Sequence, residues 1–72
     1  MDTKEGVIEA VQKYAKSATD EGYPVDITNV NYEELLTAIT EYRQSGHEGT
    51  TFDLLLEVND TIGLHQFGIF TL

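Results

Sequence analysis

Two histidines are the first candidates for chemistry in this chain. His47 is followed by Glu48, and His65 comes five residues after Asp60. A protein zinc site needs three or four ligands within tetrahedral reach, but the chain has no cysteine and no HExxH or His-x-x-x-His spacing. We therefore expect no metal site, with His47 in a loop and His65 on the surface of a strand.

An oxygen-rich run between Asp26 and Glu34 is the candidate for calcium. Carboxylate and amide oxygens are the ligands that Ca²⁺ prefers. The run lacks the glycine and the terminal glutamate spacing of a helix–loop–helix calcium site. The sequence therefore predicts only weak, adventitious cation binding here, and no cofactor.

Covalent catalysis has equally little support. Ser17 and Ser45 are the only serines, and Ser45 lies too close to His47 in the sequence to form a nucleophile–base pair with it. No glycine-rich phosphate loop is present. We expect no enzymatic activity and no catalytic or cofactor-binding residue.

Carboxylates dominate the charge of the chain and are unevenly placed. The 72 residues include thirteen Asp and Glu against four Lys and Arg, for a net charge of −9. Three of the thirteen precede Lys16, so the rest of the chain has ten carboxylates and a single cation, Arg43. Such a surface attracts basic proteins and repels nucleic acid and anionic membranes, so we expect neither of the latter as a direct partner.

The spacing of these carboxylates allows two interpretations. Glu33, Thr37 and Glu41 share one face of an expected helix. Asp53 and Glu57 share the outer side of an expected strand, roughly 13 Å apart. One interpretation is a solvated surface that keeps a small protein in solution.

The other interpretation is an array that imitates a phosphate backbone, docks on a basic nucleic-acid-handling protein and regulates or inhibits it. The shortage of neutralising lysines favours it, because solubility needs less charge and crowded like charges cost stability. Inhibitors made by phages and mobile elements have this general build. The expected contacts are Glu33, Glu34, Glu41, Asp53, Glu57 and Asp60.

Two helices are expected to position these groups. Asp2 and Glu5 have the spacing of a capping pair for a first helix, which Gly22 ends. The second helix has a strong cap at Asn31 and ends at Gly46.

The last third of the chain is expected to be extended. Apolar residues at 52, 54, 56 and 58 alternate with Asp53, Leu55 and Glu57, which is the period of a half-buried strand. A turn at 59–61 and an apolar segment over 62–72 complete a predicted C-terminal β-hairpin, and a third short strand is a candidate near 25–27. The sum is an α+β fold, with two helices packed on a small antiparallel sheet.

The predicted hairpin leaves apolar side chains on its outer side. Leu55, Phe67 and Ile69 fall on the face turned away from the helices. Either strand twist, a bulge at Gly68 or a wrapping helix buries them, or they form a homodimer or partner interface. The second case defines the alternative function, a small homo-oligomeric assembly protein.

The length predicts one small domain over residues 1–72. The first twenty residues lack the pattern of a secretory signal, and the longest aliphatic run, 54–56, is far below the roughly 20 residues that span a bilayer. The absence of cysteine is compatible with a cytosolic setting, and we expect the chain in the cytoplasm.

Overall fold

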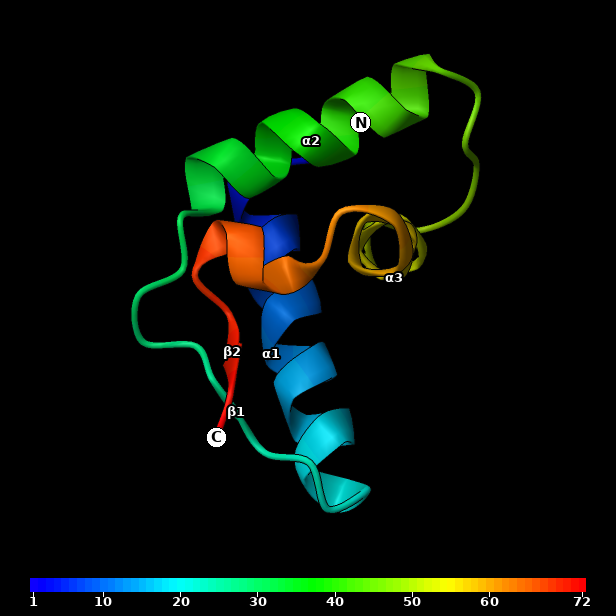
Figure 1. Cartoon of the computed structure of the whole chain (residues 1–72). Helices are drawn as coiled ribbons and strands as arrows, with labels where there is room; N and C mark the ends of the chain where they lie inside the picture. The colour runs from blue at the N-terminus through cyan, green and yellow to red at the C-terminus, as the bar shows by residue number, and fades with distance from the viewer.

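Three helices, one short 3-10 helix and two very short strands make up the computed structural model, which describes all 72 residues. The helix α2 crosses the N-terminal end of α1, and α3, seen end-on in Figure 1, lies beside both. The 3-10 helix η1 packs against α2, below it in the view of Figure 1. The elements are α1 (Lys4–Asp20), β1 (Val25–Asp26), α2 (Tyr32–Gln44), α3 (Thr51–Thr61), η1 (Leu64–Phe67) and β2 (Phe70–Thr71).

The first helix forms where the apolar periodicity predicts it, but its cap differs from the expected one. The hydroxyl of Thr3 accepts the backbone N–H of Gly6 at 3.0 Å and caps α1. Asp2 is instead drawn into an ion pair with Arg43 of α2. The helix ends before Gly22, as predicted, and Gly22 adopts a φ of 90°.

The second helix follows its local signals closely. The Asn31 side chain accepts the Glu34 backbone N–H at 3.1 Å, and Gly46 follows the helix with a φ of 103°. Both predicted ends of α2 are therefore confirmed.

The predicted strand over 52–58 is wrong, because this segment is the middle of α3. Thr50 and Asp53 form a capping box, in which each side chain accepts the backbone N–H of the other residue. The helix buries Leu54, Leu55 and Val58, whose spacing fits a helical face. The alternation of apolar and polar residues was compatible with this spacing, and the capping box selects the helix.

The sheet is small, and its strands come from distant parts of the chain. β1 pairs antiparallel with β2, with Val25 opposite Thr71 and Asp26 opposite Phe70. The α+β class, with helices packed on a small antiparallel sheet, is confirmed, as is the candidate strand near 25–27. The partner of the C-terminal strand is β1 because the segment expected to pair with it is helical.

The core is one cluster of twelve apolar residues drawn from the three helices, η1 and the residue before β2. It includes Leu55, Phe67 and Ile69, which are 0%, 8% and 4% exposed. Of the two alternatives, burial within the chain is therefore the one that the structure shows, and these three side chains do not form an outward apolar surface. In a helix Leu55 faces the core beside Leu54, and η1 turns Phe67 inward.

Candidate partner-binding site

The six carboxylates predicted to contact a partner all have exposed side chains, but they do not form one uniform face. Asp53, Glu57 and Asp60 project from α3, and the other three project from α2. Glu33 lies 3.9 Å from Nζ of Lys4, on the side of α2 that meets α1. Glu33 therefore lies apart from the other five predicted contact residues.

Three carboxylates form a row along α3. Asp53, Glu57 and Asp60 follow one another at four and three residues, which places them on one side of the helix. At 1.5 Å per residue the row is about 10 Å long, and Asp53 and Glu57 are about 6 Å apart along the axis. The strand prediction placed this pair roughly 13 Å apart, so the helix doubles the expected charge density. We call these three residues the α3 row.

Two carboxylates lie on one flank of α2. Glu34 and Glu41 are seven residues apart, two helical turns, and neither has a cation within ion-pair distance. We call them the α2 pair. Tyr42, the residue after Glu41, hydrogen-bonds to Thr61 at the end of α3. The C-terminal end of α2 and the α3 row therefore border one another.

The loop between these helices adds a second contact at the same border. His47 Nδ1 lies 2.8 Å from the Glu57 carboxylate, and its ring stacks at a tilt on Tyr42 with centroids 4.9 Å apart. Glu57 is thus partly engaged within the chain. Glu48, the next residue, is exposed and extends the acidic surface into the loop.

Asp53 is held in its charged form. The backbone N–H of Thr50 donates to its Oδ2 at 2.8 Å, and this hydrogen bond keeps the pKa of Asp53 below its usual value. The Thr50 hydroxyl and the charge of Lys13 lower the pKa further. Helix capping therefore also fixes one charge of the α3 row.

All four cations of the chain are already engaged elsewhere. Arg43 binds Asp2 through two hydrogen bonds, and Lys13 sits 4.3 Å above the centre of the Phe52 ring. Lys4 and Lys16 pair with Glu33 and Asp20. No internal cation remains to neutralise the α2 pair or Asp60.

The residues weighed for metal binding lie apart. His47 is in the α2–α3 loop, as expected, and His65 is in η1 instead of on a strand. The Asp26 carboxylate accepts the hydroxyl and the backbone N–H of Thr28, at 2.6 and 2.9 Å. No three side chains of the metal-binding types come together anywhere in the structure.

Comparison with protein families, curated proteins and solved structures finds no match. None of the helices combines the length and the apolar character that crossing a bilayer requires.

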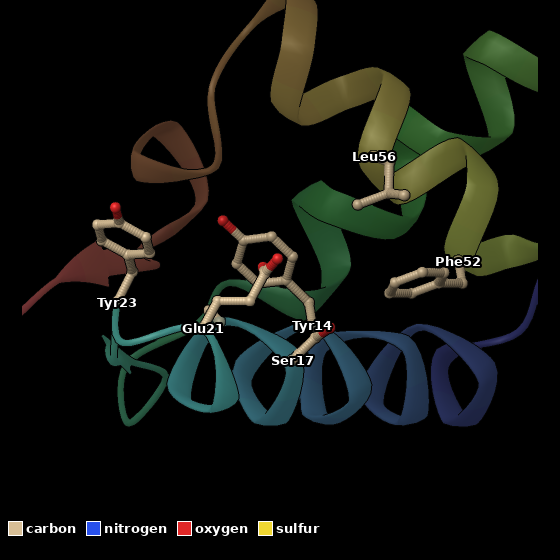
Figure 2. A pocket seen from close by; sticks show the side chains of 7 residues that line it. Tyr14, Ser17, Glu21, Tyr23, Phe52 and Leu56 are labelled. Atoms are coloured by element: carbon tan, nitrogen blue, oxygen red, sulfur yellow. The ribbon is translucent and has the colours of Figure 1, made fainter.

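An apolar groove between α1 and α3 is the feature that the sequence did not predict. Figure 2 shows Phe52 and Leu56 pointing from α3 toward α1, and Tyr14 standing between α1 and α3. The groove has a volume of about 480 Å³, and Tyr23 lines one end of it. The signal for it was present, because Phe52 and Leu56 are four residues apart and lie outside the core positions 54, 55 and 58. If the segment is interpreted as a strand, the side chains of Phe52 and Leu56 both lie on the buried side of the sheet, and no groove is expected.

Proposed function

We propose that this chain is a non-enzymatic acidic module that docks on a basic, nucleic-acid-handling protein in the cytoplasm and regulates or inhibits it. The observation that supports the proposal is the border between α2 and α3. There Glu41 and Asp60 project into solvent without any internal cation partner, and Glu34, two turns nearer the N-terminal end of α2, is equally unpaired. A basic partner supplies the missing counter-charges.

The charge density of the α3 row supports imitation of a phosphate backbone. Three carboxylates over about 10 Å correspond to one charge per roughly 5 Å of helix axis. One strand of duplex DNA has a phosphate every 3.4 Å or so along its axis. The two spacings are of the same order, so a groove that binds phosphates on neighbouring positions can accept these carboxylates.

Rigid presentation supports the proposal as well. Both acidic sets are on helices whose opposite faces are in the core, so little backbone order has to be gained on binding. Flexible acidic tails lack this advantage.

The test is capture of basic proteins on the immobilised chain from a cell extract at low salt, followed by a salt gradient. We expect nucleic-acid-binding proteins to be released in the middle of the gradient, because exposed charges are screened there. A captured protein is then purified, and its dissociation constant and its inhibition by the chain are measured. Nucleic acid should compete with the chain for it.

A charge-matched pair of variants makes the test specific. The double variant Glu34→Gln and Glu41→Gln should weaken binding about three- to tenfold, since each exposed ion pair is worth up to about 1 kcal/mol. Glu5→Gln with Glu9→Gln removes the same charge from the exposed side of α1 and should have little effect. Equal losses from both variants, or binding indifferent to salt between roughly 50 and 500 mM, would contradict docking through the α2–α3 border.

A further inference from the structure

The groove between α1 and α3 leaves large apolar side chains open to solvent. Tyr23 is 70% exposed and Leu56 is 36% exposed, while Tyr14 and Phe52 are half-buried against the core. Ala18 completes the apolar lining. A volume of about 480 Å³ falls within the roughly 300–1,000 Å³ of ligand-binding clefts. No other segment of the chain covers this groove (Figure 2).

The rims of the groove are acidic on both sides. Glu21, the residue that caps the C-terminal end of α1, is part of the lining and lies between Tyr23 and Tyr14 in Figure 2. On α3, Leu56 has Asp53 three residues before it and Asp60 four residues after it, so these carboxylates are its neighbours on the helix surface. The one cation near the groove, Lys13, is seated on the Phe52 ring.

We propose that this groove receives a basic amphipathic segment of the partner. A large apolar side chain of that segment would enter between Tyr14 and Leu56, and its lysines or arginines would reach Glu21 on one rim and Asp60 on the other. The inference deepens the proposed function and rests on it, because the α3 row forms both the acidic surface and one rim of the groove. Helices with this pattern bind apolar grooves in many recognition domains.

Charge complementarity selects this occupant over a second copy of the chain. A second copy brings a net charge of −9 toward rims that are already acidic, which costs free energy at short range. A basic segment gains at the same contacts. The apolar lining adds affinity that salt does not screen, whereas the affinity that comes from exposed charges falls as the salt concentration rises.

The experiment uses two synthetic probes and the intact chain. One probe is a leucine–lysine peptide with leucines at helical i, i+3, i+4 and i+7 positions, and the other is an oligolysine with the same number of lysines. Amide chemical shifts of the chain are followed by NMR during each titration. We expect the leucine–lysine peptide to perturb the amides of Ala18, Tyr23 and Leu56 and to bind at least tenfold more tightly than oligolysine.

Variants then locate the contact. Leu56→Gln should weaken binding of the leucine–lysine peptide about tenfold and leave that of oligolysine unchanged. Ile62→Gln is the matched control, because Ile62 is 42% exposed at the end of α3 but does not line the groove. Tyr23→Ser is a second groove variant in a loop, which keeps the test valid if Leu56→Gln unfolds the chain.

The outcomes separate the two proposals. Equal affinity for both peptides, with no effect of Leu56→Gln or Tyr23→Ser, would overturn the groove proposal and leave the acidic docking surface standing. If neither peptide bound at low salt, both proposals would be overturned. Binding of a peptide whose lysines are replaced by glutamine, as tightly as the original, would overturn the basic occupant. So would a dimer of the chain alone, seen in sedimentation, that Leu56→Gln dissociates.

Discussion

Asp2 is the residue where a single carboxylate joins three segments of the fold. Its side chain is 2% exposed. Its two oxygens accept from Nε and an Nη atom of Arg43, at 2.6 and 2.9 Å, and from the Thr51 hydroxyl at 2.8 Å. The contacts tie the N-terminal residues to the end of α2 and the start of α3. The hydrogen bonds from Arg43 lower the pKa of Asp2, against the effect of burial.

Replacing Asp2 with Asn should destabilise the chain by about 2 kcal/mol at pH 7, since hydrogen bonds to charged groups are worth this much. Because the pKa of Asp2 is lower in the folded state, its contribution is complete above the unfolded-state value of about 3.9. The contribution disappears as the pH falls through the folded-state pKa. Urea denaturation of both proteins at pH 7 and pH 3 should therefore show a difference that shrinks in acid.

Asp20→Asn serves as the control for that measurement. Asp20 forms its ion pair with Lys16 on the surface, at 3.3 Å, so its loss should change the free energy of unfolding by no more than about 1 kcal/mol. An Asp2→Asn difference that stayed constant from pH 7 to pH 3 would contradict a role for the charge.

The case of Asp2 also shows where residue-level prediction stops. Asp2 and Glu5 have the spacing of a helix cap, and the sequence gives no reason to prefer Thr3. Arg43 is the deciding partner, and it lies forty-one positions away in the sequence. Local sequence patterns rank candidate N-cap residues by residue type. They cannot show that a long-range ion pair makes one candidate, here Asp2, unable to cap the helix.

At the scale of elements, a close approach between two backbone segments holds the C-terminal region. The Asn31 backbone N–H donates to the carbonyl of Phe67 at 2.8 Å. A Cβ on Gly68 would lie 2.3 Å from the carbonyl oxygen of Asn29, and Gly68 has a φ of +87°. The position therefore requires glycine both for its conformation and for its contact.

Gly68→Ala and Gly22→Ala form a pair that separates these two requirements. Gly22 has a similar φ of +90°, but its Cβ would meet nothing within 4 Å. We expect Gly22→Ala to cost about 1 kcal/mol from conformation alone and Gly68→Ala to cost at least about 2 kcal/mol more, because backbone must move. The free energy of unfolding in urea measures both, and equal costs would contradict the close approach.

The elements also show which local signals sufficed for prediction. The end of α1 is predicted by Gly22, and the two ends of α2 are predicted by Asn31 and Gly46. These predictions succeed because helix capping is decided within a few residues. The third helix was missed although Thr50 and Asp53 have capping-box spacing. The apolar positions 54 and 58 belong to both a two-residue and a near-four-residue period, so the period alone could not decide.

For the whole molecule, composition predicted the acidic excess but not its distribution. Which carboxylates lie together depends on α3 being a helix, since a strand would spread Asp53 and Glu57 to twice their spacing. The groove depends on how α3 packs on α1, which no local pattern reports. The surface was therefore predictable in charge and unpredictable in shape.

Net charge makes the stability of the whole molecule depend on salt in a definite direction. The ion pairs at Arg43, Lys4 and Lys16 are weakened by salt, which favours unfolding. The excess of nine negative charges repels itself in the folded state, and salt weakens that repulsion too. Two of the three pairs are on the surface and are worth little, so the relief of repulsion is the larger effect.

We therefore expect thermal stability to rise with NaCl, by about 1 kcal/mol or roughly 5 °C between 10 mM and 0.5 M at pH 7. Melting followed by circular dichroism measures the rise, and KCl should reproduce it because screening depends on ionic strength. The combined variant Glu5→Gln, Glu9→Gln, Glu34→Gln and Glu41→Gln has four fewer negative charges, so its melting temperature should start higher and rise less. A melting temperature that falls with salt would mean that internal ion pairs outweigh repulsion. The carboxylates at the α2–α3 border would then lack the unrelieved charge on which docking to a basic partner depends.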